Sequence, residues 1–200
     1  AAGNAATEVT SSNFSVDRTA IISAIATSGF SWGASLNATE DNANGTVTVT
    51  TSGAEDGQTV TIVLNGVTDT ATVSSNTATI TIAASDLQGL TDGSSYTMTA
   101  NVSDAAGNAA TQVTSSSFSV DTTAPVISAI ATSEFSWGAV LNATEDNSNG
   151  TVTVTTSGAE DGQTVTIVLN GVTDTATVSS NTATITIAAS DLQGLTDGSS

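Results

Sequence analysis

Basic residues are almost absent from this 200-residue chain, which has one lysine or arginine against 19 acidic residues and a formal net charge of −18 at pH 7. The single base is Arg18, so almost none of the carboxylates can form a salt bridge within the protein. Nucleic acid is excluded as a partner, because no basic patch exists to release counterions from phosphate. Anionic membrane surfaces are excluded on the same ground.

Cysteine, histidine and lysine are absent as well, and there is one proline. Without cysteine, no disulfide can stabilise a small domain. The many serines have no evident base to activate them, and the paired acids Glu40-Asp41 and Glu55-Asp56 lack an aromatic-lined cleft, so we do not expect an enzyme. No stretch reaches the ~18 apolar residues of a membrane span, so we expect no membrane insertion by this segment.

The chain does contain a repeat of about 104 residues, which is typical of a tandem array. AAGNAATEVT at 1–10 recurs as AAGNAATQVT at 105–114, and the sequence from Asn44 to Ser95 recurs unchanged from Asn149 to Ser200. The stretch VDTTAPVI, with Pro125, indicates the joint between units. We expect three parts: the C-terminal strand of a preceding repeat and a linker at 1–19, a complete repeat at 20–121, and a repeat truncated before its last two strands at 122–200.

Alternation of Val, Ile, Leu, Ala and Thr with polar residues predicts an all-β fold. The expected strands of the complete repeat are 21–28, 45–52, 59–65, 68–74, 77–84, 96–103 and 111–120. Seven short strands in about 100 residues predict tandem immunoglobulin-like β-sandwich repeats of Greek-key type. The sequence LTDGSSY, which ends at Tyr96, has the pattern of a tyrosine corner. The alternative is an ordinary Asp-Gly turn before a core tyrosine.

Acidic loop residues are predicted to gather at the end of the sandwich where the chain enters. Strand order brings two loops and the incoming joint there, and with them the side chains of Asp17, Glu55, Asp104 and Asn108. Oxygen ligands that converge from several loops suit Ca²⁺, whereas zinc would call for histidine or cysteine. For any single acid, the alternative is that it is simply solvated.

A second and less specific acidic set is expected at the opposite end of the sandwich. It comprises Glu40, Asp41, Asn42, Asn44, Asp69, Asp86 and Asp92. The sequence ATEDNANG lacks the spacing of an EF-hand loop. Ten acids fall within residues 1–104, so neutralising all of them would take roughly five divalent ions per repeat.

The DTTAP joint and the GAEDG and DAAGN loops together resemble the bacterial immunoglobulin-like extender repeats of giant calcium-dependent RTX adhesins. The resemblance covers the whole chain. It implies a structural stalk module, extracellular and attached to the cell surface within a larger secreted protein. It also implies several calcium ions per repeat, neighbouring repeats as partners and a monomeric chain.

The resemblance further implies that the calcium ligands lie in the joints and end loops. These would be Asp17, Glu55 and Asp104, followed in the next copy by Asp121 and Glu160, with Asp56 and Asp161 as candidates in the same loops. A calcium ion held between Asp121 and the end loops of the next unit would fix the angle between units. The first joint reads VDRTAII, so we expect it to be less rigid than the joint with Pro125.

A ligand-binding module for ice or carbohydrate is the alternative function. Threonines share one face of TVTVT, at Thr46, Thr48 and Thr50, and one face of TATITI, at 77, 79 and 81. Such rows could present a flat surface of hydroxyl and methyl groups, but threonine also suits the solvent face of any strand. Trp32 and Trp137 could stack on a sugar or serve in packing.

Overall fold

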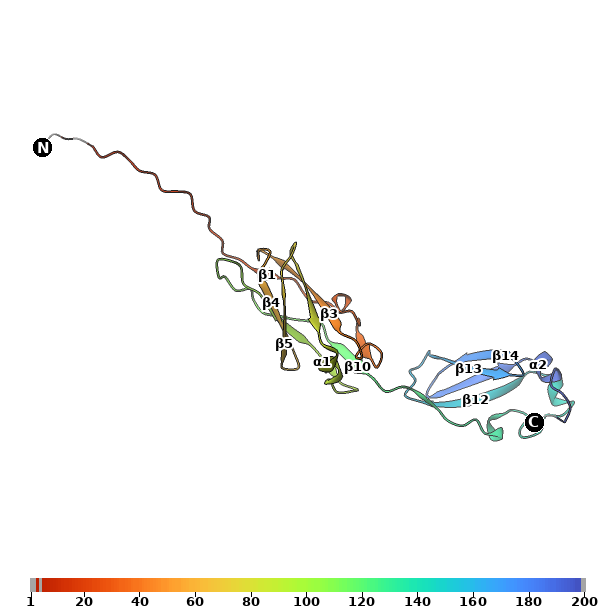
Figure 1. Ribbon diagram of the computed structural model, residues 1–200. Coiled ribbons are helices and arrows are strands. Elements are labelled where there is room, and N and C mark those ends of the chain that lie inside the picture. Colours follow the sequence, from red (N-terminus) through yellow and green to blue (C-terminus); the bar gives the residue numbers. More distant parts are fainter. Residues whose placement is uncertain (1–2, 4, 199–200) are drawn as a thin grey trace. The chain divides into compact units, whose positions relative to one another are not determined.

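The computed structural model describes residues 3 and 5–198, which form two compact units, Ala1–Thr122 (unit 1) and Thr123–Ser200 (unit 2) (Figure 1). Each unit has its own hydrophobic core. The α-helices have five residues each, and over the described ranges none is long and apolar enough to cross a membrane. The predicted all-β class is confirmed. That residues 1–19 end a preceding repeat, and that unit 2 is a truncated one, stay predictions.

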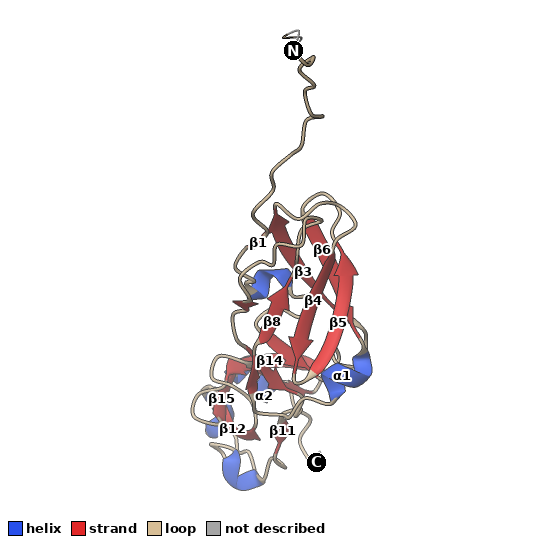
Figure 2. Ribbon diagram, turned by 90° about the vertical axis from the view of Figure 1, so that its left-hand side faces the viewer, coloured by secondary structure: helices blue, strands red, loops and turns tan. Residues whose placement is uncertain are grey.

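Unit 1 is built from two main β-sheets and one small one (Figure 2). The first sheet has the order β1 (Ile21–Ile22), β3 (Gly45–Ser52), β6 (Thr77–Ile82). The second has the order β5 (Val67–Thr72), β4 (Thr59–Leu64), β8 (Met98–Asn101), β9 (Val113–Thr114). The small sheet has the order β2 (Ser35–Asn37), β10 (Phe118–Asp121), β7 (Ser95–Tyr96), in which β10 runs parallel to β2.

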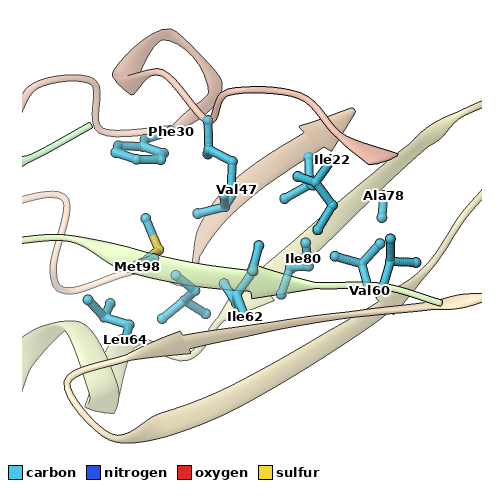
Figure 3. Close-up of a cluster of buried hydrophobic side chains, with 14 of the residues drawn as sticks. Ile22, Phe30, Val47, Val60, Ile62, Leu64, Ala78, Ile80 and Met98 are labelled. Carbon is cyan, nitrogen blue, oxygen red and sulfur yellow. The ribbon is translucent and has the colours of Figure 1, made fainter. Parts of the chain in front are cut away.

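The core of unit 1 lies between the two main sheets, where the alternating apolar residues of each strand meet (Figure 3). Val47 and Ile80 come from the first sheet, and Ile62, Leu64 and Met98 come from the second. All five are essentially inaccessible to solvent. Burial of this apolar surface, at about 25 cal/mol per Å², is the main term that stabilises the sandwich.

Aromatic residues close one side of this core. Phe118 on β10 lies 5.7 Å from Phe30 and 5.3 Å from Trp32, between ring centroids. Trp32 is buried, so its ring serves packing and is not exposed to stack on a sugar. The predicted tyrosine corner is confirmed, because the backbone N–H of Thr91 donates to the Tyr96 hydroxyl at 3.0 Å. This bonding from Thr91 also lowers the pKa of the Tyr96 phenol.

Several predicted strands are corrected by the structure. The strand expected at 21–28 is only β1, followed by a 3₁₀ turn, η1 (Thr27–Gly29). The strand expected at 96–103 is divided between β7 and β8. The strand expected at 111–120 is divided between β9 and β10, which join different sheets, because the chain crosses from one sheet to the other.

The helix α1 (Ala84–Gln88) was not predicted, and the strand expected to reach residue 84 stops at Ile82. The alternation of the TATITI strand fails at Ala83-Ala84, and the next turn buries Leu87 against the core. The first backbone N–H of the helix donates to Asn44 Oδ1 at 3.1 Å. A side chain from a distant loop therefore satisfies one of the unpaired donors of the helix start.

Unit 2 repeats the middle of this architecture. Its elements are β11 (Val126–Ile127), η2 (Thr132–Glu134), η3 (Glu145–Asn147), β12 (Gly150–Ser157), β13 (Thr164–Leu169), β14 (Val172–Thr177), β15 (Thr182–Ile187) and α2 (Ala189–Gln193). One sheet has the order β11-β12-β15, and the other is the β13-β14 pair. In the part of unit 2 that the structure describes, there is no counterpart of β2, β7, β8, β9 or β10.

Candidate calcium site

The predicted cluster at the entry end is assembled within unit 1, from the chain before β1, the loop between β3 and β4, and the loop between β8 and β9. We call Asp17, Glu55, Asp104 and Asn108 the entry-end cluster. Asn108 Nδ2 donates to the backbone carbonyl of Asp17 at 3.1 Å and to Asp104 Oδ2 at 2.7 Å. The backbone N–H of Ala105 donates to Glu55 Oε2 at 2.7 Å. Hydrogen bonds from Asn108 therefore join Asp17 and Asp104, and Glu55 is bonded to the backbone of Ala105, the neighbour of Asp104 in the chain.

Asp104 is the centre of this cluster and is only 3% exposed. Burial opposes its ionisation, but hydrogen bonds from the Asn108 side chain and from the backbone of Asn108, Ala106 and Gly107 together outweigh that effect. The pKa of Asp104 therefore lies below its ordinary value. A carboxylate held ionised and buried is the type of oxygen ligand that a hard cation requires.

The role of Asp17 differs in detail from the prediction. Its backbone carbonyl, and not its carboxylate, faces Asn108, while Oδ1 accepts a hydrogen bond from the Thr19 N–H at 3.4 Å. Within residues 3 and 5–198, no group of three or more acidic side chains is arranged to hold a metal ion on its own. Any ion at the entry end would thus need carbonyl and amide oxygens in addition to carboxylates.

The two remaining loop acids of the GAEDG sequences have a structural use. Asp56 Oδ1 accepts a hydrogen bond from the Ser75 N–H at 2.8 Å, and Asp161 Oδ1 accepts one from Ser180 at 2.7 Å. Ser75 has a positive φ of 52°, which costs energy for a residue with a side chain. Asp56 therefore holds the tight turn between β5 and β6, and Asp161 holds the same turn in unit 2.

Among the predicted acids of the opposite end, Glu40 and Asp92 take part in separate hydrogen bonds. Glu40 Oε2 accepts a hydrogen bond from the Asn37 N–H at 3.0 Å within its own loop, where Asp41 is half-buried. Asp92 Oδ1 accepts one from the Thr122 N–H at 2.8 Å, at the exit from unit 1. The exposed Asp121 ends β10, and the exposed Glu160 lies in unit 2 between β12 and β13.

Asp69 was expected among the acids of the opposite end, within the strand predicted at 68–74, and it lies inside β5, opposite Ile62. Its Oδ2 atom is buried and has no hydrogen-bond partner in the described part of the chain, and the same holds for Asp174 Oδ2 in unit 2. Burial, and after it the negative charge of Asp86, raises the pKa of Asp69. One feature of the sequence marks this position, because Asp69 interrupts a run of threonine, alanine and valine in VTDTAT.

The threonine rows that suggested a ligand-binding module lie side by side on neighbouring strands. Thr46, Thr48 and Thr50 on β3 pair directly with Thr81, Thr79 and Thr77 on β6. A second threonine row lies across the other sheet, where residues 59 and 61 pair with 72 and 70. Because both sheets carry threonine on the outside, the rows follow the general solvent-facing pattern of these strands and do not single out one binding face.

Comparisons with solved structures find adhesins. A calcium-stabilised adhesin with which an Antarctic bacterium reaches out and binds ice is 31% identical, over 88% of this chain and 42% of that one, with a TM-score of 0.49. A 1.5-MDa bacterial ice-binding adhesin, described for its retention at the host cell surface, is 29% identical, over 86% of this chain and 54% of that one, with a TM-score of 0.47. The chain thus spans about half the length of these two structures.

A single domain gives the most direct comparison. The bacterial immunoglobulin-like domain from the M. primoryensis ice-binding adhesin is 31% identical and is covered over its whole length by 54% of this chain, with a TM-score of 0.37. No family model matches the sequence, and no curated protein does. The assignment to a family therefore rests on sequence identity over a complete domain.

Proposed function

Because the chain belongs to the bacterial immunoglobulin-like repeats of large adhesins, we propose that it is a structural extender segment of an adhesin stalk at the cell surface. The observation that carries this proposal is the identity over a complete adhesin domain, combined with the tandem repeat of the chain itself. Its partners are the neighbouring repeats of the same protein. The solved relatives are adhesin domains and not enzymes, which agrees with the absence of a base for nucleophilic catalysis.

Calcium binding at the entry-end cluster is the second part of the proposal. Asn108 Nδ2 lies between two oxygens, the Asp17 carbonyl and Asp104 Oδ2. An asparagine side chain offers either its N–H₂ or its oxygen to the same position, since rotation by half a turn exchanges the two. With the oxygen turned inward, Asp17, Asp104 and Asn108 present three oxygens to one point, with Glu55 on the adjoining loop. The donor set fits Ca²⁺.

The consequence of such an ion would be mechanical. Asp17 lies in the segment before β1, whereas Asp104 and Asn108 belong to the loop between β8 and β9 near the end of the unit. In the structure, one hydrogen bond from Asn108 joins the incoming segment to that loop. A bound Ca²⁺ would add ionic bonds between the incoming segment and this loop. The direction in which the segment enters unit 1 would then be fixed.

Thermal unfolding of the 200-residue chain in CaCl₂ and in excess EGTA tests the proposal. An ion that binds only the folded state stabilises it by RT ln(1 + [L]/Kd), about 2.7 kcal/mol at a hundredfold excess over Kd. Extracellular sites of this type bind at roughly 10⁻⁴–10⁻³ M, so millimolar calcium should raise the Tm clearly. MgCl₂ at the same concentration is the control for charge screening.

Variants assign the effect to the cluster. Asn108→Ala should remove most of the calcium-dependent rise in unit 1, whereas Asp161→Asn in unit 2 should not. An identical Tm in EGTA and in calcium would refute the calcium part of the proposal. A rise that persists in Asn108→Ala would place the ion elsewhere.

A further inference from the structure

Two edge strands, β5 of the second main sheet and β6 of the first, lie next to each other in unit 1 (Figure 2). Within the described residues, β5 forms its one ladder with β4, and β6 forms its one ladder with β3. The outer edge of each strand therefore presents backbone N–H and C=O groups that no ladder uses. Such an edge is a template on which a strand of another molecule can add.

The sequence of these two strands favours such addition. β5 reads VTDTAT and β6 reads TATITI, and Asp69 is the single charged residue between Gly57 and Ser85. Segments with high β propensity, little charge and no proline are typical of strands that pair between molecules. Unit 2 has the same pattern, because β14 also reads VTDTAT and Asp174 is the single charge within 162–190. Each pair of edge strands thus carries one charge.

That one charge points into the sandwich. Asp69 lies directly opposite Ile62 in the β4–β5 ladder, and residues directly opposite each other in an antiparallel pair place their side chains on the same face. Ile62 is fully buried, so Asp69 faces the core, as Val67 and Ala71 on the same strand do. Asp69 Oδ2 is buried and has no hydrogen-bond partner in the described part of the chain, and neither has Asp174 Oδ2.

This placement lowers the stability of each unit. A buried carboxylate oxygen without a donor has lost its hydration and has gained no hydrogen bond in return. The charge of Asp86, which acts on Asp69, is also negative and adds repulsion. None of the described contacts of Asp69 offsets this cost. An inward-pointing charge on an edge strand is, however, a means by which β proteins prevent pairing between edges.

We propose that Asp69 on β5, and Asp174 on β14, prevent these edge strands from pairing with the same edge of a second copy. Two identical edges would meet antiparallel, with the inner faces of both sheets on the same side. The registers with the greatest overlap then place Asp69 opposite either Asp69 or Ala71 of the second copy. In the first register two like charges lie opposite each other. In both registers, the added strand would bury the part of the Asp69 side chain that water still reaches, which an ionised carboxylate opposes.

Protection of this edge matters most in a tandem array. Linked repeats hold many copies of one edge at a high effective concentration, and exchange of strands between repeats is a characteristic failure of such proteins. Residues 44–95 and 149–200 are identical, so no difference in sequence keeps their strands apart. A charge inside each edge strand does so without any difference between the repeats. This role requires no calcium, and it goes beyond the proposed stalk function.

The first test is self-association of the 200-residue chain in EGTA, measured by sedimentation velocity over a range of concentrations. Asp69→Asn combined with Asp174→Asn keeps the size of both side chains and removes their charge. This double variant should associate at least roughly tenfold more tightly than the unmodified chain, because like charges no longer meet between paired edges. Asp41→Asn combined with Asp146→Asn is the matched control, since it removes two charges at half-buried positions outside the edge strands. Its association should equal that of the unmodified chain.

Two further measurements assign the effect to the edge. Urea unfolding in EGTA should show that D69N/D174N is more stable than the unmodified chain, because the buried charges are gone. D69T/D174T continues the threonine pattern of the strand and should behave in the same way. Addition of T70K and T175K, on the exposed face of the same strands, should suppress the association of D69N/D174N, because lysine on an edge hinders pairing.

Four results would overturn the proposal. If D69N/D174N associates no more than the unmodified chain, these edges are protected by other means. If the Asp41 and Asp146 control associates as strongly, net charge and not the edge is responsible. A loss of stability of both neutral variants in EGTA would mean that ionised Asp69 stabilises the fold. A loss that occurs only in calcium would make Asp69 a calcium ligand instead.

Discussion

At the scale of single residues, two carboxylates of unit 1 are shifted in opposite directions by their surroundings. Asp104 has donors around both oxygens, and its pKa lies below the ordinary value of 3.8. Asp69 has one buried oxygen without a partner, and its pKa lies above that value. Ionised Asp104 therefore stabilises the fold above about pH 3.8, and this contribution is lost as the pH falls through the lower pKa of the folded state. Ionised Asp69 destabilises the fold, and this destabilisation disappears when Asp69 is protonated at lower pH.

Asp104→Asn should make stability less dependent on pH in the acid range. The unmodified chain loses stability as the pH falls below about 3.8 toward the folded-state pKa of Asp104, because the unfolded state binds the proton more tightly. The variant has no such proton to bind and should lose less over the same window, although it starts from a lower stability at pH 7. Urea unfolding in EGTA at a series of pH values measures this, with Glu8→Gln in the exposed segment as the control. Parallel curves for Asp104→Asn and the unmodified chain would contradict the role of Asp104.

At the scale of elements, the same strand sequence contributes differently to the stability of each unit. Ile62 on β4 is fully buried between two sheets, while Ile167 on β13 is half-buried. The pattern TVTIVL specifies which side chains point inward but not how completely they are covered. That depends on β8 and β10, which come from more than 30 residues further along the chain in unit 1.

Ile62→Ala should therefore cost about 2–5 kcal/mol of the stability of unit 1, as expected for a fully buried isoleucine. Ile167→Ala should cost unit 2 clearly less, because part of that side chain is already in contact with water. Urea unfolding followed by tryptophan fluorescence separates the two units, since Trp32 and Trp137 lie one in each. Equal losses in the two variants would show that unit 2 is covered as completely as unit 1 in solution.

Much of the fold could be predicted from strand periodicity. The prediction for 45–52 agrees with β3, and the expected strands at 59–65, 68–74 and 77–84 agree with β4, β5 and β6 within two residues. The sequence did not predict β2, which exists because β10 pairs with it, or the division of 111–120 between two sheets. Short edge strands have too few residues to show a period, so only their partners define them.

The candidate site was predictable to a similar degree. Strand order was enough to bring Glu55, Asp104 and Asn108 to one end, because loops that follow alternate strands share an end of a sandwich. It could not show that Asp17 turns its carbonyl toward Asn108, or that Asp56 is used by the turn at Ser75. Those details depend on local backbone angles, which the residue types alone do not determine.

At the scale of the whole molecule, repulsion among 19 acids with a single base opposes the compact state. Salt weakens this repulsion, because the Debye length falls from about 30 Å at 0.01 M to about 10 Å at 0.1 M. A bound divalent ion would act differently, since it would remove repulsion at one place only.

Raising NaCl from 10 to 150 mM in EGTA should therefore increase the Tm of both units by a few degrees. Such a shift corresponds to a gain of about 1 kcal/mol in the free energy of unfolding. Calcium added at constant ionic strength should produce a further rise. Differential scanning calorimetry measures both effects, and KCl in place of NaCl is the control for a specific sodium effect. A Tm that does not change with salt would mean that the carboxylates are too far apart, or too well hydrated, to repel one another.

The position of Arg18 has a consequence for the survival of such a protein outside a cell. Arg18 is exposed, in the segment before β1 that forms neither helix nor strand, and it is the only residue at which a trypsin-like protease could cut. Cleavage there would sever the chain ahead of the sandwich of unit 1 and leave every strand of that sandwich intact. The joint at Pro125 has no basic residue, so the same protease would find no bond to cut there. An array of these repeats would resist digestion through its composition, even where its backbone is fully accessible.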